Sequence, residues 1–363
     1  MANLLRLGRK KKRVSFVLLS TFRNFAVRMS RLRIEYIDAM RGFTMILVVY
    51  SHVCSTCLGD KWMGWNDVFF LFRLPCFFFI SGWLFDSRRR PVADTIWHKF
   101  KVQIIPTLIF LLLLAPPPLF FSKLGATKGG YWFTFALFEF FLLSIFSDRY
   151  LKKWGGAFAL VLSIAAFGYD IYYNRYFKDL GLITNLLGFL SFMTWRYYLF
   201  FYIGTWVRQH FDIFLQWTGK PVVIAFVMIG FVCVSMIPHS DSALSEYLIF
   251  AIGGILGMTM IFHLFRSSAS YLNREHLMGR CFQYVGMRTL DIYLLHYFFL
   301  PRFLLPYGEQ LRAMECKPVE FVVVLTLALL VVAACLTVSY VLRLSPFLGH
   351  WLFGVKYEER KTV

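Results

Sequence analysis

Charged side chains are scarce in this chain of 363 residues. Asp, Glu, Lys and Arg together make up 16% of it, whereas a soluble domain carries about 25%. The residue types AVILMFWYC make up 58%, and the mean hydropathy is +0.60. These polar residues are too few to cover the surface of a soluble domain. The composition therefore excludes an ordinary cytosolic enzyme, a secreted disulfide scaffold and a disordered chain. It predicts a protein that crosses a membrane several times.

Acidic residues are also few, 20 against 39 Lys and Arg, and the net charge is +19. Membrane proteins collect Lys and Arg on the cytoplasmic side, so this excess predicts membrane lipids and no nucleic acid as partner. The seven cysteines lie mostly in apolar stretches, where cysteine behaves as a small hydrophobic residue. Cys54 and Cys57 form a CxxC, but the sequence has no second CxxC to complete a metal site, so no metal is expected.

Long apolar runs, by contrast, are abundant. A membrane-crossing helix needs about 20 mostly apolar residues. Reading the sequence for such runs predicts an all-α membrane bundle of about ten transmembrane helices. The predicted spans are 38–58, 67–86, 102–121, 131–147, 156–171, 190–207, 221–237, 247–265, 287–304 and 319–342.

The distribution of basic residues predicts the orientation of this bundle. With the N-terminus inside, the inner segments hold 28 Lys and Arg and the outer loops hold 8, which by the positive-inside rule puts both termini in the cytoplasm. Residues 1–33 contain a basic run and no apolar stretch long enough for a span, so we expect a basic cytoplasmic tail on anionic lipid. Met29 is a second candidate start. The bundle is expected over 34–354 and a short cytoplasmic tail over 355–363.

Ionisable residues in the first span indicate a functional site, because a charge inside a membrane is costly unless it is paired or hydrated. Arg41 and His52 are 11 residues apart. That spacing puts them within about 20° of the same helix face and about 16 Å apart in depth. Asp38 lies one turn before Arg41 on nearly the same face. A snorkelling Arg and an interfacial His would explain each residue alone but not the shared stripe, so we favour function.

The second span carries a further buried charge. Arg73 lies about two turns from the outer end of this span, at a depth comparable to that of His52. On the cytoplasmic side the span is followed by Arg88, Arg89 and Arg90. This triplet is either a stop-transfer cluster or a clamp for a phosphorylated ligand, and the two interpretations are compatible.

Two later spans also contain polar groups. Glu139 lies midway along the fourth span, where it could pair with Arg73, orient His52 or form a purely structural ion pair. In the ninth span, Tyr293 and His296 are three residues apart and share a helix face. They are either site residues or core groups that hydrogen-bond to neighbouring helices.

Three motifs together resemble the integral-membrane acyltransferase-3 family. The Arg41-x10-His52 pair preceded by Asp38 resembles the signature of that family's first helix. LPCFFFISGWLF at 74–85 and GMRTLDIYLLH at 286–296 resemble two further family motifs. The resemblance covers most of the chain, and ten spans is the family's core count.

The resemblance implies transfer of an acyl group, usually acetyl, from cytoplasmic acyl-CoA to a hydroxyl of a cell-envelope glycan or a lipid-linked acceptor, in the inner membrane of a bacterium. A His can take the proton of a hydroxyl, because imidazole titrates near neutral pH. The residues assigned to catalysis are His52, Arg41, Asp38, Arg73 and Glu139. The residues assigned to the acyl-CoA donor are Arg41, Ser81, Arg88, Arg89, Arg90, Tyr293 and His296.

This sequence departs from the family pattern at Arg73-Leu74, where relatives often carry His-Met before the proline. Two other functions stay open. A non-enzymatic transporter or flippase of an amphipathic glycan needs buried charges along a pathway, but it needs neither a His at that spacing from an Arg nor a phosphate-binding cluster on one side. An enzyme with two cytoplasmic substrates is disfavoured by the depth of His52.

Overall fold

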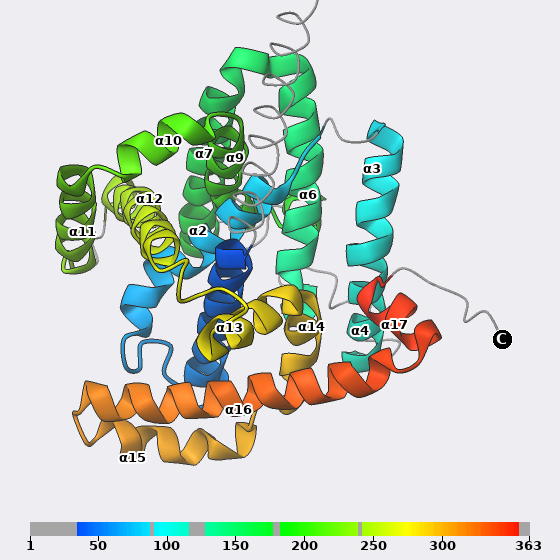
Figure 1. The fold of residues 1–363 in the computed structure, drawn as a ribbon, viewed down its shortest axis with the longest axis vertical. Coiled ribbons are helices and arrows are strands. Elements are labelled where there is room, and N and C mark those ends of the chain that lie inside the picture. The colour runs from blue at the N-terminus through cyan, green and yellow to red at the C-terminus, as the bar shows by residue number, and fades with distance from the viewer. Residues whose placement is uncertain (1–34, 88–90, 116–127, 177–181, 239–241, 356–363) are drawn as a thin grey trace, which may run out of the picture.

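The structure is a computed structural model that describes residues 35–87, 91–115, 128–176, 182–238 and 242–355. Every regular element within these ranges is a helix (Figure 1). The all-α class predicted from the sequence is therefore confirmed. The tail predicted over 1–33, most of the tail predicted over 355–363, and the Arg88, Arg89 and Arg90 cluster lie outside the described residues.

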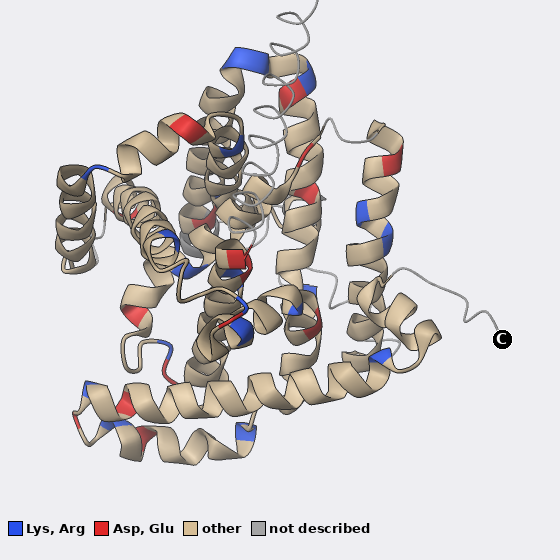
Figure 2. Ribbon diagram, in the orientation of Figure 1, with Lys and Arg blue, Asp and Glu red and all other residues tan. Residues whose placement is uncertain are grey.

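Among the described residues, six helices are long and apolar enough to cross a membrane, and the protein is a multi-pass membrane protein. These candidate spans are the first helix (Glu35–Cys57), α2 (Asn66–Leu84), the run Val92–Leu114, the run Trp132–Tyr172, α12 (Ala243–Ser267) and α16 (Lys317–Arg343). The pair α10 (Phe211–Thr218) and α11 (Pro221–Ser235), bent by 80°, makes a seventh if it counts as one span. Figure 2 shows α11 without a charged residue and α16 charged only near its ends.

Two of the candidate runs are composite. Val92–Leu114 contains α3 (Val92–Lys99), a π-helical turn η2 (Phe100–Ile104) and α4 (Ile105–Leu114). Trp132–Tyr172 contains α6 (Trp132–Phe146), the short turns η4 (Ser147–Leu151) and η5 (Lys152–Trp154), and most of α7 (Gly155–Tyr176). Lys152 has a φ of +45°, and the chain turns back there (Figure 1). Because 41 residues of straight helix would be about 60 Å long, twice the thickness of a bilayer core, α6 and α7 provide two separate segments, as the sequence predicts.

Two predicted spans are shorter helices in the structure. The stretch 190–207 is divided between η6 (Phe192–Tyr197) and α9 (Tyr198–Gln209), and Ser191, with a φ of +51°, separates them from α8 (Leu182–Phe189). The stretch 287–304 holds α14 (Thr289–Phe299), which ends because Pro301 forces Leu300 into an extended conformation. By length and composition alone, the described residues show six or seven candidate spans when Trp132–Tyr172 is counted as one, and the predicted number of ten is not shown.

Close backbone contacts bring the site-bearing helices together. A Cβ atom on Gly82 of α2 would lie 2.0 Å from the carbonyl oxygen of Phe201 in α9. A Cβ atom on Gly286 of α13 (Leu277–Met287) would lie 1.8 Å from the carbonyl oxygen of Asp38. Only glycine permits such approaches. Helix α2 is consequently packed at backbone distance against α9, and the first helix against α13, which leads directly into α14.

The C-terminal helices complete the fold around α14. The chain runs from α14 through η7 (Arg302–Tyr307) and α15 (Gly308–Arg312) into α16, which lies crosswise to α6 in Figure 1, and ends in α17 (Pro346–Phe353). Asp291 of α14 accepts hydrogen bonds from Nε and Nη2 of Arg343 at 2.7 and 2.8 Å, and also one from Ser339. Asp291 is 1% exposed. This buried ion pair fixes α14 against α16.

Candidate active site

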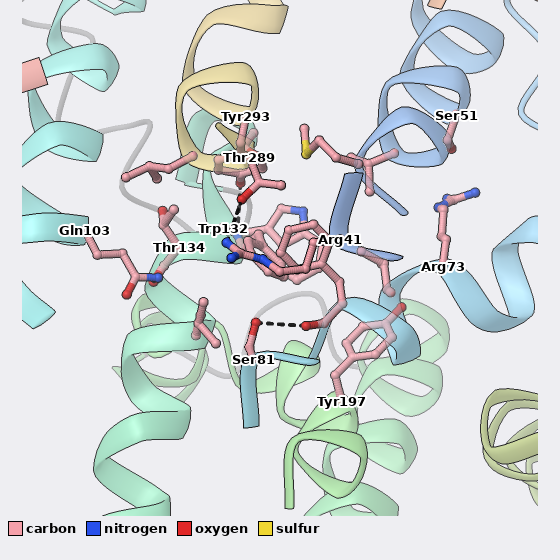
Figure 3. A pocket seen from close by; sticks show the side chains of 18 of the residues that line it. Arg41, Ser51, Arg73, Ser81, Gln103, Trp132, Thr134, Tyr197, Thr289 and Tyr293 are labelled. Carbon is pink, nitrogen blue, oxygen red and sulfur yellow. Dashed lines mark hydrogen bonds between the residues drawn. The ribbon is translucent and has the colours of Figure 1, made fainter. Parts of the chain in front are cut away.

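A cavity of about 560 Å³ lies between the first helix, α2, η2, α6, η6 and α14. Figure 3 shows side chains from these elements converging on it. Its polar lining residues include Arg41, Ser51, His52, Arg73, Ser81, Lys99, Gln103, Thr134, Arg196, Tyr197, Thr289 and Tyr293. Arg41, His52, Arg73, Ser81 and Tyr293 were among the site residues predicted from sequence, and the fold brings these five together.

Arg41 is held from two sides. Its Nη1 lies 3.5 Å from Oδ1 of Asp38 on the preceding turn, as the helical spacing predicts. Its Nη2 donates a 3.0 Å hydrogen bond to Oγ1 of Thr289, which begins α14 (Figure 3). Asp38 does not line the cavity. Its carboxylate therefore acts on the site through Arg41, which it neutralises and orients.

His52 lies at the other end of the cavity, at the point where the first helix changes from α-helical to π-helical geometry. The π-helical turn η1 (Val53–Cys57) follows it directly, and such turns are frequent at functional sites. The His52 ring lies beside two rings of α14, with centroid distances of 4.9 Å to His296 and 5.2 Å to Tyr297. The sequence placed His52 and His296 on separate helices without indicating that they meet.

His296 itself is fully buried and does not line the cavity. Its Nδ1 lies 2.7 Å from the carbonyl oxygen of Tyr293 and 3.2 Å from that of Ile292. Since carbonyl oxygens only accept, Nδ1 carries the proton when the ring is neutral. The buried Nε2 has no hydrogen-bond partner among the described residues. His296 thus contacts the ring of His52 from outside the cavity lining, and its assignment to the donor stays a prediction.

Arg73 lies at the same end of the cavity as His52. Its Nη1 donates a 2.8 Å hydrogen bond to Oδ1 of Asn66, and the guanidinium carbon lies 5.2 Å from the centre of the Phe70 ring. Asn66 in turn donates to Oγ of Ser51 at 3.3 Å. Ser51 precedes His52, so this chain of contacts links Arg73 to the residue next to the histidine. The comparable depth predicted for Arg73 and His52 agrees with this arrangement.

Glu139 lies outside the cavity lining and binds a different partner. Its Oε2 accepts a 2.7 Å hydrogen bond from Nε1 of Trp195, and the residue does not line the cavity. Between these described side chains, neither the pairing with Arg73 nor the contact with His52 is formed. Two of the three alternatives that the sequence left open for Glu139 are therefore not formed, because the period of an all-apolar helix does not show which face of α6 points toward α2. The catalytic assignment of Glu139 stays a prediction.

Sequence reasoning missed several lining residues, of which Lys99 and Gln103 are the most informative. Lys99 Nζ lies 4.0 Å from the centre of the Phe141 ring and 5.7 Å from that of Phe85, which directly follows α2. Gln103 donates a 3.2 Å hydrogen bond to the carbonyl oxygen of Thr134. In the predicted topology, Lys99 contributes only to the charge of a loop between two spans. Lys99 and Gln103 are four residues apart and share a helix face, and this spacing was a signal that could have found them.

The cavity is cationic. Arg41, Arg73, Lys99 and Arg196 line it, and none of its lining residues is Asp or Glu. Arg196 is paired outside the cavity wall, 2.5 Å from Asp170. A cavity with this lining favours an anionic occupant, because a buried cation is costly without an anion nearby.

Comparison with known proteins agrees with this arrangement. The model of the acyltransferase domain matches residues 34–344, which is most of the chain. No curated protein and no solved structure matches the chain significantly. The matched region contains every residue that lines the cavity. The chain belongs to the acyltransferase-3 family of integral-membrane acyltransferases.

Proposed function

We propose that this acyltransferase moves an acyl group, specifically acetyl, from cytoplasmic acyl-CoA to a hydroxyl of a cell-envelope glycan or lipid-linked acceptor in the cytoplasmic membrane of a bacterium. The observation that carries the proposal is the cavity itself, which has His52 at one end, Arg41 at the other, and cations but no acid along its wall. Family membership makes the chain an enzyme, which sets aside the non-enzymatic flippase.

His52 is proposed as the general base. It takes the proton of the acceptor hydroxyl while the oxygen attacks the thioester carbonyl. An oxygen–carbon bond forms, the carbon–sulfur bond breaks, and the proton leaves with the thiolate as CoA thiol. A base must lie within hydrogen-bond reach of the proton that it takes, so the thioester is expected near His52.

Arg41 is then proposed to bind the phosphates of the donor. Arg41 and His52 are about 16 Å apart along the first helix, which is too far for Arg41 to reach a carbonyl attacked at His52. Lys99 lies beside the C-terminal end of α2, the end that also carries Ser81, with its Nζ 5.7 Å from the centre of the Phe85 ring. CoA carries several phosphate charges, which guanidinium and ammonium groups bind through charge-assisted hydrogen bonds. The cluster Arg88–Arg90 remains a further proposed contact.

Lys99→Gln is expected to raise the acetyl-CoA concentration needed for half-maximal rate by roughly tenfold, because one charge-assisted contact to phosphate is lost. The maximal rate should change less, since Lys99 is remote from His52. Release of CoA thiol by the purified enzyme measures both quantities. Lys101→Gln is the matched control, because Lys101 is exposed and does not line the cavity. Equal shifts in the two variants would remove Lys99 from the donor site.

We also propose ten spans with both termini in the cytoplasm, supported by the ratio of 28 to 8 basic residues on the two sides. In a background without the native cysteines, a cysteine replacing Glu309 in α15 should react with an impermeant thiol reagent added outside intact cells. A cysteine replacing Glu275, between α12 and α13, should react only after the cells are opened. Both positions are exposed in the structure. Labelling of position 275 from outside would reverse the orientation.

The function as a whole is tested by mass spectrometry of envelope glycans from cells with and without the gene. The expected result is a mass difference of one acyl group on a glycan fraction, removable by mild alkali because the product is an ester. Identical glycan spectra from the two strains would refute the proposed acceptor class.

A further inference from the structure

We propose that the outer end of the cavity binds an anionic group of the acceptor, a carboxylate or a phosphate, on the guanidinium of Arg73. The inference rests on the proposed function and adds to it the chemical class of the acceptor. Three observations carry it: the uncompensated charge of Arg73, the edge of its guanidinium that faces no partner, and its place beside His52.

The charge of Arg73 has no acidic counterpart in the described part of the chain. The side chain is buried, with 7% of its surface exposed, and its hydrogen bond goes to the neutral amide of Asn66. The other two arginines of the cavity wall are ion-paired, Arg41 with Asp38 and Arg196 with Asp170. Because a buried cation is costly without an anion nearby, a bound anion would stabilise this site.

The geometry leaves one edge of Arg73 for a ligand. Nη1 is occupied by Asn66, whereas Nε and Nη2 donate no hydrogen bond within the described residues. Nε and Nη2 together form the edge of a guanidinium that binds two oxygens of a carboxylate or phosphate at once. Arg343 uses these same two atoms to hold Asp291, at 2.7 and 2.8 Å. Arg73 therefore presents the group that holds a carboxylate elsewhere in this fold.

Asn66 prepares Arg73 for this role. It is 1% exposed, and its Nδ2 donates to the carbonyl oxygen of Lys61 at 2.5 Å and to Oγ of Ser51 at 3.3 Å. These bonds leave its Oδ1 to accept from Arg73. A neutral amide fixes the direction of the guanidinium without cancelling its charge, as a preorganised anion site requires.

The position of Arg73 assigns this anion to the acceptor rather than to the CoA phosphates. Arg73 is eight residues from Ser81 on α2, about 12 Å along the helix, and Ser81 marks the end where Arg41 and Lys99 lie. The donor phosphates are proposed at that end. Arg73 instead lies at the end where Ser51 and His52 meet the acceptor hydroxyl, so the anion belongs on the same molecule as that hydroxyl.

The test uses the wild-type enzyme in membranes, radiolabelled acetyl-CoA, and the envelope glycan fraction that becomes labelled. One sample of this fraction has its carboxylates reduced to alcohols with carbodiimide and borohydride, and a second has its phosphates removed with cold hydrofluoric acid. We expect one of the two treatments to raise the KM for the acceptor about tenfold or more, the size expected from loss of a charge-assisted contact. The treatment that does so identifies the anion.

The variant Arg73→Gln should raise the KM for the intact acceptor by a similar factor, leave the KM for acetyl-CoA unchanged, and show no further loss with the neutralised acceptor. Arg73→Lys should recover part of the affinity. Arg208→Gln is the control, since Arg208 pairs with Asp86 outside the cavity, 2.9 Å away.

Two results would overturn the inference. In the first, the wild-type enzyme uses both neutralised acceptors as well as the intact one, an outcome that requires no variant to fold. In the second, Arg73→Gln lowers kcat alone. That result would mean that Arg73 stabilises the oxyanion formed at the thioester carbonyl and does not bind an anionic group of the acceptor. Absence of any labelled glycan would be a failure of the proposed function itself, and the inference would fall with it.

Discussion

His52→Gln is expected to lower the rate of acyl transfer by roughly 10²–10⁴-fold, the usual contribution of a positioned general base. Glutamine keeps approximate size and hydrogen bonding but cannot accept the proton of a hydroxyl at neutral pH. The variant should still insert and still bind acyl-CoA, because Arg41 and Lys99, the residues proposed to bind the donor, line the other end of the cavity. Transfer of radiolabelled acetyl to the envelope glycan measures the rate, and protection of the protein against thermal unfolding by acetyl-CoA measures binding.

The matched control is His263→Gln. His263 is a partly buried histidine of α12 whose Nδ1 lies 3.0 Å from the carbonyl oxygen of Thr218, and it does not line the cavity. Its substitution should leave turnover nearly unchanged. His296→Gln is unsuitable as a control, because the rings of His296 and His52 are in contact. Near-normal turnover in His52→Gln together with an inactive, folded His296→Gln would move the base to α14.

Asp291→Asn is expected to destabilise the protein by about 3–5 kcal/mol, the usual cost of removing one partner of a buried ion pair. Asp291 is 1% exposed and receives two hydrogen bonds from Arg343, and the substitution leaves that guanidinium without its counter-charge. Because the pair joins α14 to α16, its loss also weakens the packing of α14, the helix that carries Thr289 and His296. Thermal unfolding in detergent, followed by tryptophan fluorescence, measures the change.

Asp67→Asn is the control for this prediction. Asp67 pairs with Lys317 at 3.7 Å, and both side chains are about half exposed, 45% and 56%. An exposed pair of this kind contributes about 0–1 kcal/mol, so the unfolding temperature should barely change. Similar losses in the two variants would mean that burial does not determine the strength of the Asp291 pair.

Local features of the sequence predicted several parts of this molecule correctly. The first helix, α2, α12 and α16 agree with predicted spans, because a long apolar run reports directly on the helix that contains it. The shared helix face of Asp38, Arg41 and His52 could also be predicted from the sequence, since the period of a helix determines which of its own residues share a face. Breaks inside a helix were harder to see, and the short α9 and α14 were predicted as full spans.

Contacts between helices were decided by tertiary structure alone. The sequence contained no sign that Arg41 meets Thr289, that the rings of His52 and His296 touch, or that Glu139 binds Trp195. Helices in a membrane are apolar on the lipid-facing side as well as on the side that faces other helices. Hydrophobic periodicity therefore leaves the rotation of each helix about its axis undetermined, and only the packing of all helices together selects which side chains share the cavity.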